Sequence, residues 1–175
     1  MSDVRRHRNV DAVVAAARDL GLDLTIRTFP EGTRTAADAA AAIGVSLGQI
    51  VKSLAFAVDG RMAMALMSGS NRLDEAALAS AAGGARCERV GADEVRAATG
   101  YPIGGVPPFG HATAIPVFVD RDLLTHDEVW AAAGTPNDNF AIALTELVRV
   151  TQGTVADLAS RQGFAGGASG APSAW

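Results

Sequence analysis

The stretch IVKSLAFAVDGRMAMALMS, residues 50–68, carries the strongest fold signal in this chain. It contains two apolar runs, Ile50 to Val58 and Met62 to Ser68, joined at Asp59-Gly60. An Asp-Gly pair between two such runs favours a tight turn, because these residues accept the positive φ angles that hairpin turns require. The stretch therefore predicts a β-hairpin.

Lys52 interrupts the first apolar run and is the only lysine among the 15 Lys and Arg residues of the chain. Positions that need only a positive charge have become arginine, so a retained ammonium indicates a site where the two side chains are not interchangeable. An unpaired buried ammonium is costly, so Lys52 must reach a partner or a cavity. A lysine that snorkels from a strand end is the alternative interpretation.

Apolar spacing, capping residues and terminal glycines predict the remaining elements on both sides of the hairpin. Thr35 and Asp74 are expected to be helix N-caps, and Asp38 nearly completes a capping box with Thr35. Helices are predicted over Val10–Leu20, Thr35–Gly44, Asp74–Ala82, Ala92–Thr99 and, with Thr145 as N-cap, Thr145–Val150, and further strands over Leu24–Phe29, Ile115–Asp120, Glu128–Ala133 and Phe140–Leu144. Strand pairs separated by helices indicate an α+β fold with a mixed sheet.

Length and composition bound the domain organisation. A chain of 175 residues with 49% hydrophobic and 19% charged residues is expected to form one folded domain, over residues 1–162. Residues 163–175 are a Gly/Ala/Ser/Pro tail that is expected to be disordered. Cys87 is the only cysteine, which excludes an internal disulfide, and the three histidines are not at metal-ligand spacing, so neither a metal nor a cofactor is expected.

The net charge of −4 argues against a protein that grips long duplexes through many phosphates, so no DNA partner is expected. A contact with nucleic acid would be local, such as one strand end. No window approaches eighteen uninterrupted apolar residues, and the basic N-terminus is not followed by an apolar stretch. We therefore expect no membrane partner and a cytoplasmic location.

A loop rich in glycine and proline, GYPIGGVPPFG, follows the fourth predicted helix at residues 100–110. Proline restricts φ and stiffens the loop, while glycine lets another molecule approach the backbone closely. Such a loop can aim main-chain N–H groups at a ligand, as in an oxyanion hole. A wide turn around a sheet edge is the alternative, and the loop matches neither a Walker motif nor the dinucleotide fingerprint.

Two motifs together resemble the YbaK/prolyl-tRNA synthetase-associated domain family of aminoacyl-tRNA editing proteins. The first is Thr35 to Ala42 followed by LGQIVKSL at residues 47–54. The second is Thr99 to Tyr101 with IGGV at residues 103–106 and PFG at residues 108–110. The resemblance covers residues 9–160. It implies a mixed, largely antiparallel, barrel-like sheet surrounded by helices.

The resemblance implies a deacylase that acts in trans on mischarged tRNA, usually prolyl tRNA carrying a small amino acid such as alanine, cysteine, serine or 2-aminobutyrate. Lys52 would hold the phosphate of the terminal adenosine. Gly104 and Pro108 would border the aminoacyl carbonyl, and Gly105 and Val106 would supply amides between them. The implied partners are the acceptor 3′ end of tRNA and prolyl-tRNA synthetase.

No serine, cysteine or aspartate is arranged as a nucleophile with its base, so hydrolysis would rely on positioned water, oxyanion stabilisation and, as in the family, the substrate 2′-hydroxyl. His111, directly after the loop, is the only nearby general-base candidate. Ala131–Pro136 is the expected pocket for the amino-acid side chain, because its own side chains are short and uncharged. The candidates for substrate binding are Phe29, Ser68, Gly69, His111, Gly134 and Thr135.

Ser70 departs from the family pattern, because many members carry an aspartate there, and an acidic contact is therefore expected to be missing. A non-catalytic module of the same fold that binds tRNA or a synthetase is the first alternative function. An unrelated small-molecule binder with an apolar cavity is the second. The presence of both Lys52 and the Gly104 to Pro108 element favours the enzyme.

Overall fold

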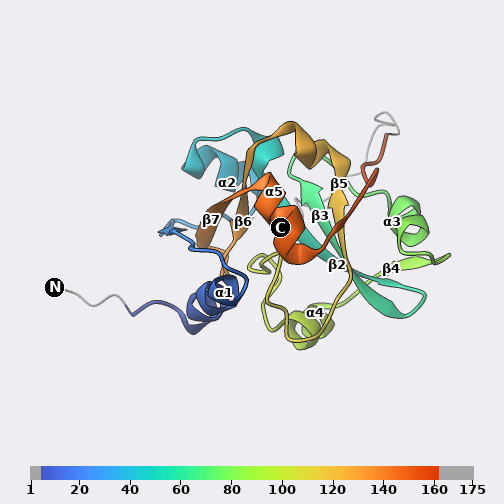
Figure 1. The fold of residues 1–175 in the computed structure, drawn as a ribbon, viewed down its shortest axis with the longest axis horizontal. Helices are drawn as coiled ribbons and strands as arrows, with labels where there is room; N and C mark the ends of the chain where they lie inside the picture. Colours follow the sequence, from blue (N-terminus) through green and yellow to red (C-terminus); the bar gives the residue numbers. More distant parts are fainter. Residues whose placement is uncertain (1–4, 162–175) are drawn as a thin grey trace.

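The predicted hairpin is confirmed and lies at the centre of the larger of two sheets (Figure 1). Strands β2 (Val51–Val58) and β3 (Arg61–Ser68) pair antiparallel along their whole length. Asp59 and Gly60 make the turn with φ angles of 48° and 79°, as the Asp-Gly signal requires. The structure is a computed structural model that describes residues 5–161, so the predicted tail over residues 163–175 lies outside the described residues.

The strands of the described residues form two sheets, which confirms the predicted α+β class with mixed, largely antiparallel pairing. Only the β3–β5 and β5–β8 pairs are parallel. The sheets do not close into a barrel, because between residues 5 and 161 only the bridge of Ile50 with Trp130 joins them. The larger sheet has the order β4 (Cys87–Arg89), β2, β3, β5 (Val117–Asp120), β8 (Thr154–Ala156), and the smaller has the order β1 (Ile26–Thr28), β7 (Asp138–Ala143), β6 (Glu128–Ala132).

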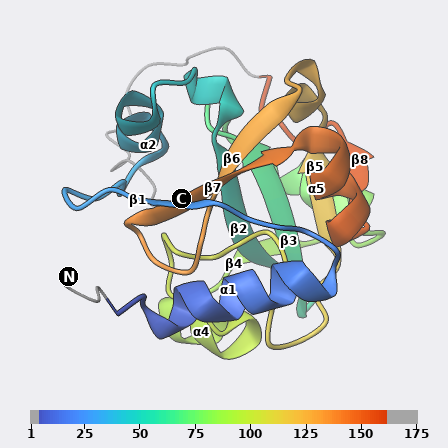
Figure 2. The same ribbon diagram turned by 60° about the vertical axis from the view of Figure 1, so that its left-hand side comes forward.

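The helices cover the faces of these sheets. The largest group of buried apolar side chains, here called the main core, includes Val13 and Ala17 of α1 and Ala131 of β6. On α2, Ala39 instead packs in a separate group with Ala132. Because neighbouring residues of a strand point to opposite faces, α1 and α2 cover opposite faces of the smaller sheet (Figure 2). The helices are α1 (Arg8–Asp19), α2 (Ala36–Ile43), α3 (Glu75–Ala81), α4 (Ala92–Thr99) and α5 (Leu144–Thr151), with short 3-10 helices η1 (Leu47–Gln49) and η2 (Arg121–Thr125).

Two of the three predicted N-caps are confirmed. The Thr35 hydroxyl accepts the Asp38 N–H at 3.0 Å and the Asp38 carboxylate accepts the Thr35 N–H at 3.3 Å, which completes a capping box. Asp74 caps α3 through the amides of residues 76 and 77. The prediction for Thr145 is wrong. Helix α5 begins at Leu144, whose N–H donates to the Asp127 carbonyl at 2.9 Å, so the helix start has a main-chain partner instead of a side-chain cap.

Candidate functional site

The candidate site lies where the two sheets meet, at the bridge between Ile50 and Trp130, here called the junction. Beyond this bridge β2 and β6 form no further strand pair among residues 5–161, and β4 pairs with β2 only at residues 56–58. The edge of β2 from Lys52 to Ala55 therefore has no strand partner among residues 5–161. An unpaired strand edge leaves main-chain groups accessible to a ligand.

Lys52 lies on β2 two residues after the junction and opposite Met67 of β3. The side chain is only 9% exposed, and its ammonium donates a hydrogen bond to the main-chain carbonyl oxygen of Asn71 at 2.5 Å. Burial lowers the pKa of the Lys52 ammonium, the negative charge of Asp120 opposes this effect, and Arg72 adds to it. The lysine is thus a buried cation with a main-chain acceptor and a nearby carboxylate.

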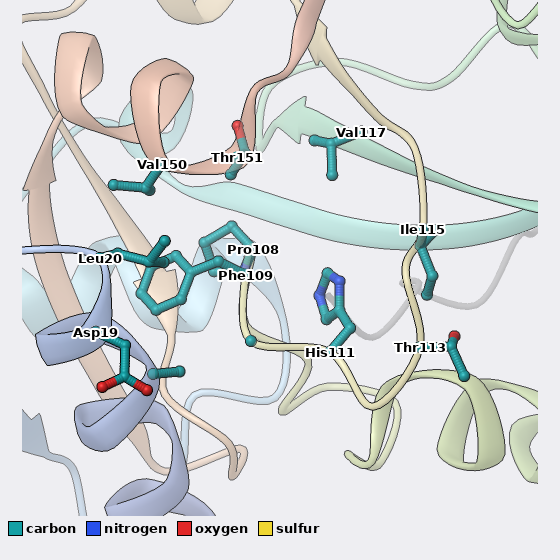
Figure 3. Close-up of a pocket in the computed structure, with 12 residues that line it drawn as sticks. Asp19, Leu20, Pro108, Phe109, His111, Thr113, Ile115, Val117, Val150 and Thr151 are labelled. Carbon is teal, nitrogen blue, oxygen red and sulfur yellow. The ribbon is translucent and has the colours of Figure 1, made fainter.

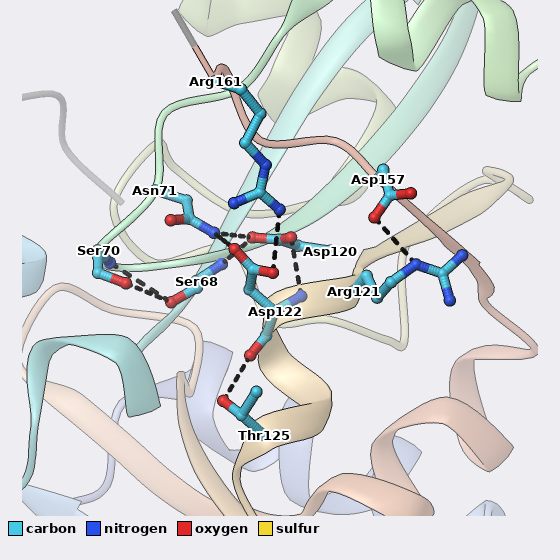
Figure 4. Close-up of polar contacts among 9 residues, drawn as sticks. All are labelled: Ser68, Ser70, Asn71, Asp120, Arg121, Asp122, Thr125, Asp157 and Arg161. Carbon is cyan, nitrogen blue, oxygen red and sulfur yellow. Dashed lines mark hydrogen bonds and ion pairs between the residues drawn. The ribbon is translucent and has the colours of Figure 1, made fainter. Parts of the chain in front are cut away.

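The side chain of Asn71 is held by two carboxylates at the end of β5 (Figure 4). Its amide donates to Asp120 at 2.8 Å and to Asp122 at 2.7 Å. Asp120 is fully buried and also accepts the N–H groups of Ser68 and Asp122, both at 3.1 Å. Arg161 donates to Asp122 at 3.1 Å. Hydrogen bonds of this kind fix the loop that carries the acceptor for Lys52.

Ser68 and Gly69, at the end of β3, contact the 3-10 helix η1. The Ser68 hydroxyl donates to the Gly48 carbonyl at 2.9 Å and lies 3.0 Å from the Ser70 hydroxyl. A Cβ on Gly69 would lie 2.5 Å from the Leu47 carbonyl oxygen, so only glycine fits. Ser70 thus joins a hydroxyl pair with Ser68, and Asp120 and Asp122 are the carboxylates of the network around Asn71. A substrate contact of Ser68 or Gly69 stays a prediction.

The glycine-rich loop is packed into the protein. Residues 104–109 are all buried, and Gly104 has a φ of 90°, which strains any side chain. A Cβ on Gly105 would lie 2.8 Å from the main chain of Gly134, so the two backbones touch. The Gly105 N–H already donates to the Pro102 carbonyl at 2.9 Å. The Val106 N–H makes no hydrogen bond within residues 5–161, and the role of both amides toward a substrate stays a prediction.

The Gly134-Thr135 turn is held from two sides. Asn9 of α1 donates its side-chain amide to the Gly134 carbonyl at 3.0 Å, and Gly134 has a φ of 97°. The Thr135 hydroxyl donates to Asp138 at 2.5 Å, as does that of Thr28. Asn9 and Asp138 were not predicted, because their partners are distant in sequence or belong to another strand. Thr135 therefore orients a buried carboxylate, and its contact with substrate stays a prediction.

The three alanines of the predicted pocket turn do not line an open pocket. Ala131 and Ala133 lie in the main core, and Ala132 packs under α2. All three are buried. Within the predicted turn, Thr135 and Pro136 are the partly exposed residues, and a pocket for the amino-acid side chain at this turn stays a prediction.

His111 lies in a cleft of about 360 Å³ between α1, the loop, β5 and α5 (Figure 3). Its Nε2 is 2.7 Å from the Pro107 carbonyl oxygen, so Nε2 carries the proton and donates it. Burial lowers the pKa of His111, and the hydrogen bond with Pro107 opposes this effect. The cleft is lined by Ala16, Asp19, Leu20, Pro108, Phe109, Gly110, His111, Thr113, Ile115, Val117, Val150 and Thr151. Neither Lys52 nor its partners belong to this lining.

Phe29 lies beside the junction, where its ring contacts the guanidinium of Arg27. The Arg27 Cζ atom is 5.1 Å from the centroid of the Phe29 ring and 5.4 Å from that of Trp130. Phe29 is half-buried, and its N–H donates to the Asn137 carbonyl at 2.8 Å. Phe29 thus belongs to a cation–π group at the junction, and its contact with substrate stays a prediction.

Three buried polar atoms have no hydrogen-bond partner within the described residues: Ser53 Oγ, Trp130 Nε1 and Asn139 Oδ1. They lie on β2, β6 and β7, the strands at or next to the junction. Buried polar groups are nearly always paired, so an unpaired set indicates a place for water or a ligand. Ser53 was missed in the sequence, although a hydroxyl next to Lys52 inside an apolar run was a usable signal.

The candidate residues fall into two groups on opposite faces of β2. Lys52 shares its face with Met67 and Leu54, whereas Val106 of the loop packs in the main core with Val51. Lys52 lies on the first face, and the second group consists of Gly104, Gly105, Val106, Pro108, Gly134 and Thr135. Ser68 is directly opposite Val51, so its side chain leaves β3 on the second face. The unpaired edge of β2 lies between them.

Within residues 5–161, no group of three or more His, Cys, Asp or Glu residues is arranged to hold a metal ion. No helix in the same range is long and apolar enough to cross a membrane.

Comparison with known proteins matches this arrangement to one family. The aminoacyl-tRNA editing domain family matches residues 30–150. The crystal structure of a candidate trans-editing enzyme for prolyl tRNA synthetase superimposes with a TM-score of 0.84 at 42% identity, over 88% of this chain and 98% of that one.

Two curated relatives point the same way. A candidate Cys-tRNA(Pro)/Cys-tRNA(Cys) deacylase of Enterococcus faecalis is 25% identical over 77% of this chain and 82% of its own. The proline–tRNA ligase of Maridesulfovibrio salexigens is 32% identical over 61% of this chain, but the match spans only 18% of the ligase. The chain therefore belongs to the YbaK-type family of aminoacyl-tRNA editing domains, as its two sequence motifs predicted.

Proposed function

We propose that this protein is a trans-editing deacylase that hydrolyses the ester of mischarged prolyl tRNA carrying a small amino acid. The observation that carries the proposal is the unpaired edge of β2, with the buried ammonium of Lys52 on one face and the Gly104–Pro108 loop on the other. Membership of the editing-domain family and the names of the relatives support it.

Lys52 binds the phosphate of the terminal adenosine in this proposal. An ammonium has three N–H groups, and the described contacts use one of them, the donation to Asn71. The fold already removes most of the Lys52 ammonium from solvent, so binding a phosphate oxygen costs little further desolvation of the lysine. The remaining N–H donors can therefore bind an anion strongly. The Asn71 carbonyl holds the ammonium in place before the substrate arrives.

The Gly104–Pro108 loop stabilises the ester during hydrolysis. Water adds to the aminoacyl carbonyl carbon, the bond from that carbon to the ribose oxygen breaks, and the ribose oxygen takes up a proton. The Val106 N–H makes no hydrogen bond within the described residues and is the donor that we assign to the developing oxyanion. Packing of Gly105 on Gly134 holds this donor in position.

The substrate supplies part of the chemistry through its vicinal 2′-hydroxyl, which assists the attacking water. Ser53 is our candidate for the side chain that orients this hydroxyl. It lies next to Lys52 but on the face of β2 that carries Val51 and the loop, and its own hydroxyl has no partner in the described chain. A hydroxyl can both donate and accept, which suits a ribose partner.

Release of amino acid from tRNA tests the proposal. Purified protein is incubated with alanyl-, cysteinyl-, seryl- and 2-aminobutyryl-tRNA, each made on prolyl tRNA, with correctly charged prolyl tRNA as the control. We expect release from at least one of the four and none from the control, because an editing deacylase has to spare the correctly charged tRNA. Binding of these tRNAs without release would identify a non-catalytic module instead.

A further inference from the structure

Arg27 presents a positive charge that the fold holds but does not neutralise. Its guanidinium carbon lies over the Phe29 ring, 5.1 Å from the centroid, and over the Trp130 ring, 5.4 Å from the centroid. The residue is exposed, and it forms no ion pair within residues 5–161. Two aromatic contacts restrict the planar group and leave the N–H groups at its rim for a ligand.

The side chains of Arg27 and Lys52 project from the same side of their strands. Arg27 is opposite Asn139, which is opposite Ala132, and the side chains of such pairs share a face. Ala132 packs with Ile50, which lies directly before β2 in extended backbone and two residues before Lys52, so the two side chains point to the same side. Arg27 and Lys52 therefore project from the same side of the two sheets, and α2 packs over Ala132 and Ile50 between them. Neighbouring strands are about 4.8 Å apart, so the two cations are separated by a few strand widths.

We propose that Arg27 binds a second phosphate of the tRNA 3′ end, one nucleotide or more before the phosphate bound by Lys52. This inference rests on the proposed function, since it places the single-stranded acceptor end along this side of the sheets. A guanidinium fork matches two phosphate oxygens, and phosphate contacts give the strand its position without reading sequence. The acidic protein thus binds RNA through two local cations instead of a basic surface.

Three variants and a ladder of substrates test the proposal. Arg27→Gln removes the charge and keeps a planar amide against the rings, and Arg27→Lys keeps the charge and loses the fork. Arg61→Ala is the matched control, because Arg61 is also exposed, forms no ion pair in the described chain and lies opposite Val58 at the far end of the hairpin from Lys52. The substrates carry the same amino acid on adenosine, on the trinucleotide CpCpA and on full-length tRNA.

We expect Arg27→Gln to match the wild type on aminoacyl-adenosine, which has no phosphate, and to lose roughly tenfold in kcat/KM on CpCpA and tRNA. The slope of log Kd for uncharged tRNA against log salt should fall by about 0.7, the value for one phosphate of a single strand. Arg27→Lys should retain part of the affinity, and Arg61→Ala should retain all of it.

An equal loss on adenosine and on tRNA would overturn the proposal, because the guanidinium would then act on the fold or the nucleoside. An Arg27→Gln variant with unchanged salt slope would overturn it as well. Both results leave the proposed function standing if the wild type still releases amino acid. A wild type that releases none would instead refute the proposed function.

Discussion

The ammonium of Lys52 and the carboxylate of Asp120 are linked through one residue, Asn71, although Lys52 and Asp120 lie on strands separated by β3. Lys52 donates to the Asn71 carbonyl, and the Asn71 side chain donates to Asp120. Asp120 also raises the pKa of Lys52 against the effect of burial. The buried carboxylate therefore affects both the position and the charge of the lysine.

Asp120→Asn should shift the pH dependence of tRNA binding. The Lys52 ammonium is charged below its pKa, so phosphate binding is present there and is lost as the pH rises through that pKa. Because Asp120 raises this pKa, its removal lowers it, and the alkaline loss of binding should move to lower pH. The Kd of uncharged tRNA, measured from neutral to alkaline pH, reports the shift.

Asp157→Asn is the control for this experiment, since Asp157 is an exposed carboxylate that pairs with Arg121. The control should keep the wild-type pH profile. In Asp120→Asn only one of the two side-chain heavy atoms can accept, so at least one of the N–H donors of Ser68, Asn71 and Asp122 loses its acceptor, and we expect a stability loss of about 1–3 kcal/mol. An alkaline limb that stays in place in a folded Asp120→Asn protein would show that Asp120 does not influence Lys52.

Gly105→Ala should damage both stability and turnover. The new Cβ would lie 2.8 Å from the Gly134 carbonyl and 2.9 Å from Thr135 Cα, so main chain must shift. Overpacking of this kind costs about 1–3 kcal/mol, and displacement of the Val106 donor should lower kcat by roughly 10²-fold. Thermal melting and single-turnover deacylation measure the two effects.

Gly60→Ala provides a variant of similar stability with an intact site. Gly60 has a φ of 79° at the hairpin turn, where a Cβ meets no atom within 4 Å, so only left-handed strain of about 1–2 kcal/mol is added. This variant should retain full turnover. Equal losses of turnover in both variants would mean that activity follows stability and that the loop has no specific role.

His111→Gln should retain most of the activity. Burial lowers the pKa of His111, and its Nε2–H is engaged with the Pro107 carbonyl, so the imidazole supports the loop from the cleft. Glutamine can donate a similar hydrogen bond, and the loss of the original one costs about 1 kcal/mol. We expect less than a roughly tenfold fall in kcat/KM, whereas removal of a general base costs about 10²–10⁴-fold. A fall of that size in a variant with normal melting would restore the general-base role.

Local signals in the sequence were sufficient for the hairpin and the start of α2. Asp59-Gly60 specifies its own turn, and Thr35 with Asp38 specifies its own helix start, because each signal acts within four residues. The three-residue strands β4 and β8 were not predicted, since three residues are too few to show the periodicity that the longer stretch over residues 24–29 showed for β1.

The network around Lys52 could not be predicted from local signals. Asn71 and Asp120 are 49 residues apart, and their contact exists only because β3 and β5 end side by side. The same holds for Asn9 and Gly134, which are 125 residues apart. The sequence indicated Lys52 and the loop through residue type and motif, but the partners that hold them depend on the topology of the sheets.

Single-turnover release of the preferred amino acid from prolyl tRNA by the wild type, Lys52→Ala and Lys52→Arg tests the central claim most directly. Lys52→Ala should reduce release to near the uncatalysed rate while the protein keeps its fold, because it removes the phosphate-binding ammonium. Lys52→Arg should also be poor, since a planar guanidinium does not fit a buried site built around one carbonyl acceptor. Near-normal release by the arginine variant, or by the alanine variant, would contradict the account.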